Sequence, residues 1–95
     1  MTRKSAQPIF PLVEVRNPLS LSARERSVAT LISYGFDNIR IAQVLGIEYN
    51  TVSTHIYKIF SKLGVRNRLE LTIAVRANPD IVGPIEPSGR PPNPP

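Results

Sequence analysis

Cysteine is absent from this 95-residue sequence, and His55 is its only histidine. Without cysteine the chain can form no disulfide bond, no thiolate nucleophile and no cysteine-based zinc site. A lone histidine has no second imidazole with which to build a metal site. Because no set of residues supplies a nucleophile, a base or metal ligands, we expect no catalytic residue, no metal and no cofactor, and no enzymatic activity.

Long apolar runs and acidic residues are also scarce. No apolar run is long enough for a membrane-spanning helix, and the segment after Arg3 and Lys4 lacks the apolar stretch of a secretory signal. The 12 lysines and arginines outnumber the 7 acidic residues, and this excess favours a polyanionic partner such as nucleic acid. We expect a cytoplasmic protein with one small domain and no membrane contact.

Proline is missing from the centre of the chain. Three of the ten prolines lie in the first 18 residues and seven lie between Pro79 and Pro95. The gap predicts a domain over residues 19–78, preceded by a flexible N-terminal arm (1–18) and followed by a disordered proline-rich tail (79–95). The arm is apolar enough to pack on the helices or on a partner, through Ile9, Phe10, Leu12, Val13 and Val15.

Caps and glycines predict the first two helices. Ser22 and Glu25 have the spacing of a capping box, and Gly35 can close that helix near Tyr34. Asp37 can cap a short second helix that stops at Gly46. The inward residues are expected to be Val28, Leu31 and Ile32 in the first helix and Ile41, Ala42 and Leu45 in the second.

The third helix has the most regular apolar spacing and the fourth has a clear start. One buried face is predicted from Val52, Ile56, Ile59, Phe60 and Leu63. Gly64 terminates this helix. Asn67 followed by Glu70 predicts the cap of a fourth helix, which runs to Asn78 because a residue before proline disfavours helical geometry. No strand pattern competes, so the fold class is all-α with four helices.

Ala42, Gly46 and Val52 have the spacing A-x3-G-x5-V. The small residue allows two helices to cross closely, the glycine makes the tight turn, and the β-branched residue fixes the second helix against the first. This pattern is typical of a helix-turn-helix.

Four separated segments extend the pattern: LSARERSV, YGFDNIRIAQVLGI, NTVSTHI and KLGVRNRLEL. Their order and gaps resemble the LuxR-type helix-turn-helix, also called the NarL/FixJ type, from residue 21 to about 75. The resemblance implies a four-helix DNA-binding domain with the third helix in the major groove and the fourth helix pairing two copies. It also implies base contacts from Ser53, Thr54 and Tyr57, with Thr51 and His55 close to the DNA backbone.

The polar face of the third helix agrees with that implication. Short polar groups near the helix start can approach base edges, and lysines nearer its end suit phosphates. Arg66 is as compatible with plain solvation as with a phosphate contact. The expected DNA-binding residues are Asn50, Thr51, Ser53, Thr54, Tyr57, Lys58, Lys62 and Arg66.

Four positions depart from the family pattern. Ser53 replaces a common lysine or arginine, which lowers affinity or changes specificity. Glu48 replaces a common serine or threonine cap; its charge suits the helix dipole but lies near the expected phosphates. Ile39, with Arg40, replaces a lysine-glutamate pair and could mark a contact with a partner.

The fourth helix has two semi-apolar faces. Leu71, Ala74 and Val75 can close the core. The other face predicts a dimer interface through Leu69, Thr72, Ile73 and Arg76. A two-fold dimer would match half-sites about 10 base pairs apart.

Our leading hypothesis is a nucleoid-associated, sequence-specific transcription regulator that binds double-stranded DNA as a homodimer. LuxR-type regulators usually carry a sensing domain before this module; only 18 residues precede it here, so abundance, a partner or the arm would regulate it. The alternative is a protein-binding antagonist that pairs with another LuxR-type regulator. The transcription machinery is a further possible hetero-partner.

Overall fold

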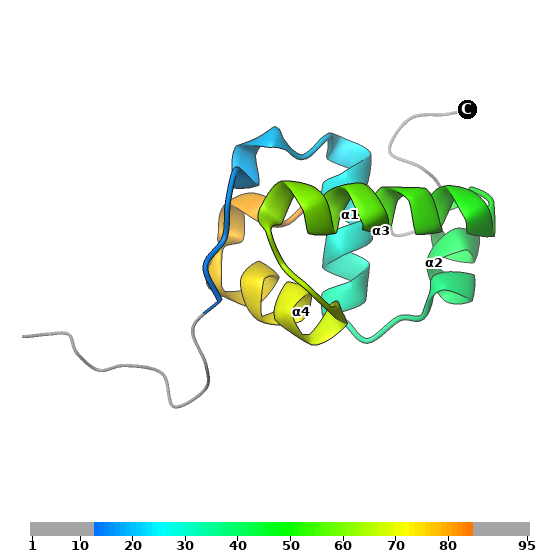
Figure 1. Ribbon diagram of the computed structural model, residues 1–95. Helices are drawn as coiled ribbons and strands as arrows, with labels where there is room; N and C mark the ends of the chain where they lie inside the picture. Colours follow the sequence, from blue (N-terminus) through cyan, green and yellow to red (C-terminus); the bar gives the residue numbers. More distant parts are fainter. Residues whose placement is uncertain (1–12, 85–95) are drawn as a thin grey trace, which may run out of the picture.

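Four α-helices make up most of the regular structure in the computed structural model, which describes residues 13–84 (Figure 1). They are α1 (Ala23–Ser33), α2 (Asn38–Leu45), α3 (Tyr49–Leu63) and α4 (Arg68–Ala77). Two short 3-10 helices flank them, η1 (Pro18–Ser20) and η2 (Pro79–Ile81). No strand occurs within these residues. The predicted all-α, four-helix fold is confirmed.

The boundaries of α1 follow from local hydrogen bonds. The amide of Glu25 donates to the hydroxyl of Ser22 at 3.0 Å, and the amide of Ser22 donates to the Glu25 carboxylate at 2.9 Å. Gly35 has a φ of 92°, and the Phe36 amide donates to the Leu31 carbonyl at 3.2 Å. The predicted capping box and glycine ending are therefore both confirmed.

The other helix starts differ in how they are capped. Asp37 accepts from the Arg40 amide at 2.8 Å at the start of α2, as predicted. The Glu48 side chain makes no capping bond at the start of α3. At the start of α4, Asn67 accepts from the Glu70 amide at 2.8 Å. The Glu70 carboxylate bonds the Arg66 amide and not the Asn67 amide, so only half of a capping box forms there.

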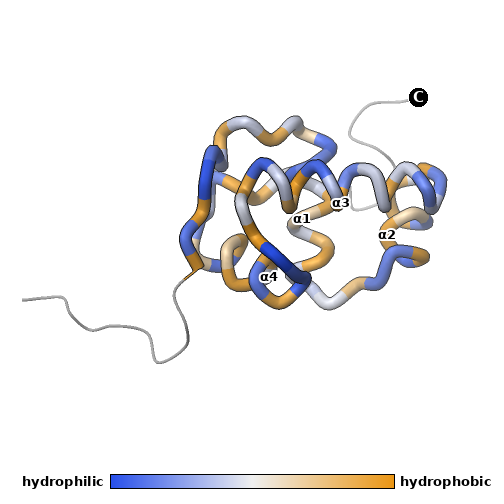
Figure 2. Tube along the Cα trace, viewed as in Figure 1, coloured by the Kyte–Doolittle hydropathy of each residue, from blue (hydrophilic) through white to orange (hydrophobic). Residues whose placement is uncertain are grey.

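The core lies where α1 meets the other three helices. Figure 2 shows that the helices carry both hydrophobic and hydrophilic residues. The predicted inward residues of α1 are all buried. In the helix-turn-helix, Val52 is buried on α3 and Gly46 has the left-handed φ of 69° that the turn requires. Ile56 and Phe60 are only half-buried at the edge of the core. The core is completed by Ile41, Leu45, Ile59, Leu63, Leu71, Ala74 and Ile81.

Both flanking segments pack on the helices within residues 13–84. Val13 and Val15 of the arm contact the core, and the amide of Arg16 donates to the Leu63 carbonyl at 2.9 Å. Residues 9–12 of the arm lie outside the described residues. Packed structure continues past the predicted tail boundary at residue 79, because Ile81 is 0% exposed. Composition assigned residues 79–84 to the tail, but a single isoleucine at the right position joins the core. Residues 85–95 lie outside the described residues.

Candidate nucleic-acid interface

The helix α3 turns most of the predicted DNA-binding residues away from the core. In Figure 1 it lies on the near side of the domain, across α1 and next to α2. Tyr57 is 76% exposed and Ser53 is partly exposed, so neither side chain is sealed inside the fold. The exposed members of this surface are Asn50, Thr51, Thr54, Tyr57 and Lys58.

Thr54 presents a defined pair of groups on this surface. Its hydroxyl donates to the carbonyl of Asn50 at 3.0 Å, within the first turns of α3. Because that proton is used inside the helix, the outward groups of Thr54 are an acceptor oxygen and a methyl group. A methyl group on a helix in the major groove can contact the methyl group of thymine.

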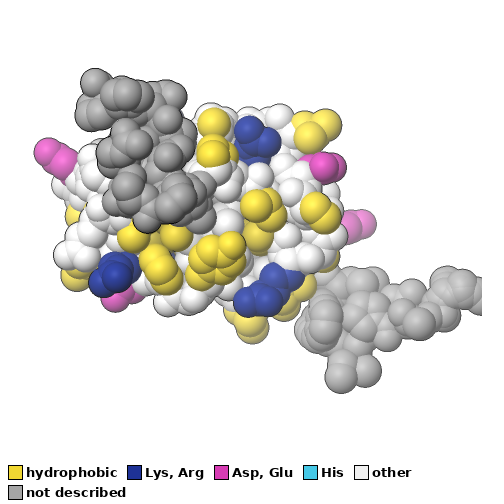
Figure 3. All heavy atoms as spheres, turned by 180° about the vertical axis from the view of Figure 1, so that it is seen from behind, with side chains coloured by type: hydrophobic (Ala, Val, Ile, Leu, Met, Phe, Trp, Pro, Cys, Tyr) yellow, Lys and Arg dark blue, Asp and Glu magenta, His cyan; other side chains and the backbone are white. Residues whose placement is uncertain are grey.

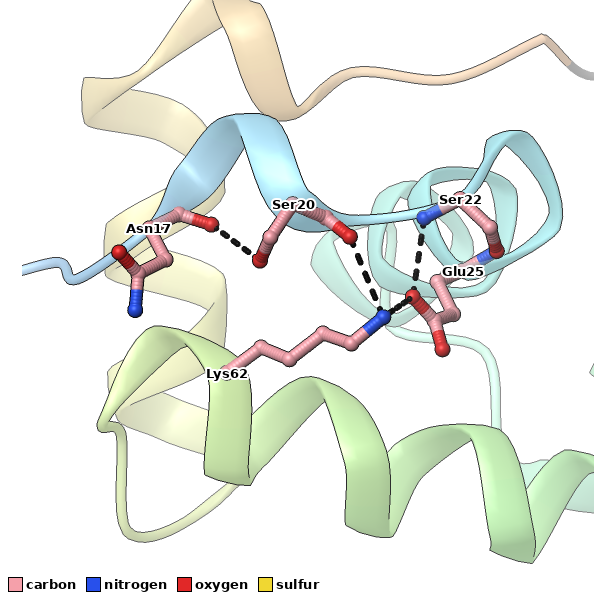
Figure 4. Close-up of polar contacts among 5 residues, drawn as sticks. All are labelled: Asn17, Ser20, Ser22, Glu25 and Lys62. Atoms are coloured by element: carbon pink, nitrogen blue, oxygen red, sulfur yellow. Dashed lines mark hydrogen bonds and ion pairs between the residues drawn. The ribbon is translucent and has the colours of Figure 1, made fainter.

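Lys62, which we expected to contact phosphate, is engaged inside the protein. Its Nζ atom lies 2.8 Å from Oε1 of Glu25 and 3.1 Å from the carbonyl oxygen of Ser20 (Figure 4). Burial alone would raise the pKa of Glu25, but the hydrogen bonds from Lys62 and the Ser22 amide, together with the Lys62 charge, outweigh it and lower that pKa. Glu25 is therefore a buried carboxylate kept ionised by Lys62.

Arg66 also has an internal partner. Its Nη2 atom lies 2.8 Å from Oε2 of Glu70, one turn along the chain. The Arg66 side chain is 84% exposed, so water screens the attraction and the pair holds Arg66 only weakly. Lys58, by contrast, is exposed and forms no ion pair or side-chain hydrogen bond within residues 13–84. Of the three cationic side chains in the predicted interface, Lys62 has a buried partner, Arg66 has an exposed one, and Lys58 has none among residues 13–84.

His55 is half-buried on α3, at the edge of the polar face. Burial lowers its pKa, and the charges of Arg24 and Lys58 act in the same direction, while Glu25 opposes them. Its Nδ1 atom is buried and has no hydrogen-bond partner within the described part of the chain. The imidazole is therefore neutral at neutral pH, and any contact with DNA would come from its outer edge.

The first turn of α1 holds both helices of the helix-turn-helix, which the sequence did not predict. The Nη1 atom of Arg24 donates to the Leu45 carbonyl at the end of α2, at 3.2 Å. The neighbouring Glu25 binds Lys62 on α3. No local sequence pattern predicts these contacts, because the bonded residues are 21 and 37 positions apart in the chain.

The two faces of α4 separate as predicted on the core side. Leu71, Ala74 and Val75 are buried. On the other side Leu69 is 69% exposed, and a groove of about 270 Å³ runs from it to Phe36. Figure 3 shows hydrophobic side chains gathered on the face seen from behind Figure 1, with lysine or arginine side chains among them.

The remaining predicted interface residues are less open. Thr72 and Ile73 are half-buried, and the Thr72 hydroxyl donates to the Arg68 carbonyl at 3.0 Å. Arg76 is exposed, but its Nη2 atom donates to the Ser33 carbonyl at the end of α1, at 3.1 Å. The four residues are spaced by three, one and three along α4 and so lie on one face of it, with Leu69 as its most exposed apolar side chain.

Ile39 is 60% exposed at the start of α2 and borders Tyr49 in an open groove of about 320 Å³.

No group of three potential metal ligands comes together among residues 13–84. Within the same residues, no helix has the length and apolar character needed to cross a membrane.

A sequence model of the GerE family, described as bacterial regulatory proteins of the luxR family, matches residues 19–75. The chain belongs to the LuxR family of bacterial regulatory proteins. This confirms the resemblance drawn from the four motifs. The matched range takes in all of α1, α2 and α3 and most of α4, so the helix-turn-helix described above is that of this family.

Bacterial regulators are among the relatives of this LuxR-family chain. It is 39% identical to the monoamine regulon transcriptional regulator of Klebsiella aerogenes, over 73% of this chain and 35% of that protein. It is 45% identical to the probable transcriptional regulatory protein SgaR of Hyphomicrobium methylovorum, over 62% of this chain and 30% of that protein. The two-component response regulator PprB of Pseudomonas aeruginosa is 38% identical, over 66% of this chain and 24% of that protein.

The chain thus spans about a third or less of the length of these curated relatives. No solved structure matches it significantly.

Proposed function

We propose that this LuxR-family chain is a sequence-specific transcription regulator that inserts α3 into the major groove of double-stranded DNA. The observation that carries this proposal is the exposed polar face of α3, with Tyr57 and Thr54 at its centre. The opposite, apolar face of the same helix is buried in the core and fixes α3 in place. The printed names of the relatives describe transcriptional regulators, which supports the same function. The proposal requires no catalytic step, and places the protein in the cytoplasm on the nucleoid.

Within the interface we assign two kinds of contact. Asn50, Ser53, Thr54 and Tyr57 approach base edges, because short polar groups and a phenol can form hydrogen bonds in the groove. Lys58 contacts phosphate and Thr51 lies near the DNA backbone. The buried partner of Lys62 argues against a phosphate contact from that side chain. The exposed pair of Arg66 with Glu70 is weak and leaves a phosphate contact from Arg66 open.

We further propose that two copies pair through α4, around Leu69, Thr72, Ile73 and Arg76. Support comes from the exposed Leu69 and from the groove that it forms with Phe36 and Thr72. A two-fold dimer of this kind would bind half-sites about 10 base pairs apart.

Selection of bound sequences from a randomised DNA pool tests the function directly. Enrichment of a palindrome supports both base recognition and two-fold pairing, and no enrichment contradicts the proposal. Tyr57→Ala should then weaken binding to the selected duplex. Tyr34→Ala serves as the control, because Tyr34 is an exposed tyrosine at the end of α1 and is not part of α3.

The second candidate function is a protein-binding antagonist that pairs with another LuxR-type regulator. It is favoured by the exposed Ile39 beside Tyr49 and by the missing side-chain cap at Glu48. Analytical ultracentrifugation of this chain mixed with a full-length LuxR-type protein distinguishes the two. Mixed dimers in the absence of DNA binding would support the antagonist, and DNA-bound homodimers alone would support the regulator.

A further inference from the structure

The two lysines of α3 lie one turn apart in sequence but have different surroundings. Lys58 is exposed and has no partner in the described part of the chain. The Lys62 side chain is only 36% exposed, and its Nζ atom binds both Glu25 and the Ser20 carbonyl (Figure 4). The sequence places both lysines on the polar side of α3, and their different roles follow from their tertiary contacts.

The partner of Lys62 cannot easily release it. Glu25 is buried, and its Oε1 atom accepts from both the Ser22 amide and Lys62. If Lys62 moved to a phosphate, the carboxylate would remain charged and buried without a counterion, which is strongly unfavourable. The cation of Lys62 is therefore held at the start of α1 and not on the DNA side.

The same end of α3 is attached to the rest of the protein at one further point, and the segment that binds it is itself fixed. The Leu63 carbonyl accepts from the Arg16 amide at 2.9 Å, and the Ser20 that binds Lys62 is itself held by a hydrogen bond from its hydroxyl to the Asn17 carbonyl, at 2.7 Å. The segment from Arg16 to Glu25 thus anchors the last turn of α3. A helix of 15 residues is about 22 Å long, so a tilt of about 5° at one end moves the other by about 2 Å.

We propose that Lys62 is a positioning residue for DNA recognition. It acts through Glu25 and Ser20 to set the angle of α3 on α1, and Lys58 is the lysine of α3 that contacts phosphate. The inference rests on the proposed DNA binding. The two roles predict different salt dependence of DNA binding. A lysine that contacts phosphate releases counterions, so its loss makes the affinity less dependent on salt; the loss of a positioning lysine does not.

The test compares Lys62→Met with Lys58→Met, two substitutions of the same kind one turn apart. Binding to a duplex selected from a randomised pool and to a random duplex is measured by fluorescence anisotropy at several salt concentrations. Lys58→Met should reduce the salt slope by about one and weaken both duplexes to a similar degree. Lys62→Met should leave the slope unchanged and reduce the preference for the selected duplex several-fold. A slope reduced equally by Lys62→Met would overturn the proposal.

Two further variants separate positioning from loss of folding. Lys62→Arg keeps the cation and should retain most of the preference for the selected duplex. Glu25→Gln can still cap Ser22 but cannot pair with Lys62 as a carboxylate. It should lose the preference as Lys62→Met does. If Glu25→Gln discriminates between the two duplexes as well as the unmodified protein does, the proposal is wrong.

Hydrogen exchange of the unbound protein tests the anchor without DNA. Amides in the last turn of α3, including that of Leu63, should exchange faster in Lys62→Met than in Lys58→Met. Equal exchange would show that Lys62 does not anchor the helix. If the unmodified protein binds no duplex, the proposed function fails, and the exchange result still decides whether the anchor exists.

Discussion

The amide of Gly83 donates a hydrogen bond to the hydroxyl of Thr30, 2.9 Å away and 53 residues earlier in the chain. This contact, with a second one from the Ser27 hydroxyl to the Pro84 carbonyl, fastens the segment after α4 to the surface of α1. The backbone approaches so closely that a Cβ atom at Gly83 would lie 2.5 Å from the Ser27 amide nitrogen. The backbone at Gly83 therefore lies close against the backbone of α1.

Gly83→Ala should destabilise the protein, because its methyl group would collide with backbone atoms that cannot move freely. We expect the free energy of unfolding to fall by roughly 1–3 kcal/mol, as for other overpacked sites. Thermal unfolding followed by circular dichroism measures this change. The neighbouring Val82→Ala, at a half-exposed position, should have a smaller effect; an equal effect would argue against the collision.

Ile81→Ala should lower the free energy of unfolding by about 2–5 kcal/mol, the usual range for a large aliphatic residue removed from a core. Ile81 is fully buried, whereas Leu19 is 81% exposed. Leu19→Ala is therefore the control and should change stability by about 0.5 kcal/mol at most. Denaturant unfolding provides the measurement, and similar midpoints for the two variants would show that residues 79–84 do not belong to the domain.

The lowered pKa of Glu25 makes stability depend on pH in the acid range. A carboxyl whose folded pKa lies below its ordinary value of 4.5 stabilises the fold above that value, and the contribution is lost as pH falls through the folded pKa. We expect the melting temperature of the unmodified protein to drop below about pH 4.5. The drop should be shallower in Glu25→Gln, which has no proton to gain. Parallel curves would mean that Lys62 does not stabilise the ionised carboxylate.

Leu69→Glu should prevent pairing without unfolding the domain, because this side chain is mostly exposed and two carboxylates would face each other in a two-fold interface. Sedimentation velocity should show a monomer for this variant and a dimer for the unmodified chain. Leu19→Glu places the same charge on another exposed leucine and should remain dimeric. A dimeric Leu69→Glu would assign the interface to a different surface.

Local features of the sequence predicted the helices well because their causes are local. The Ser22 and Glu25 cap joins residues three apart, and the glycine endings depend on the backbone of single residues. The exposed face of α3 followed from helical periodicity in the same way. These interactions form from neighbours in the chain, whatever the rest of the fold does.

The roles of single charged and apolar residues depended on distant partners. Lys62 and Lys58 have equivalent places in the pattern of α3, yet only Lys62 meets Glu25, 37 residues away. Ile81 belongs to a proline-rich segment whose composition favours disorder, but it fills a site in the core. Amino-acid composition describes the average property of a segment, whereas burial depends on where each side chain lies in the fold. Composition therefore could not predict that Ile81 is buried.

By itself the sequence determined the four helices, their ends, and the polar face that α3 presents, since these rest on interactions within one or two helical turns. Only the tertiary structure decided which lysine of that helix keeps an uncommitted charge and that Ile81 packs in the core. Electrostatic pairing and close packing act through space over a few ångströms, and the order of residues along the chain does not specify which distant groups will come within that range.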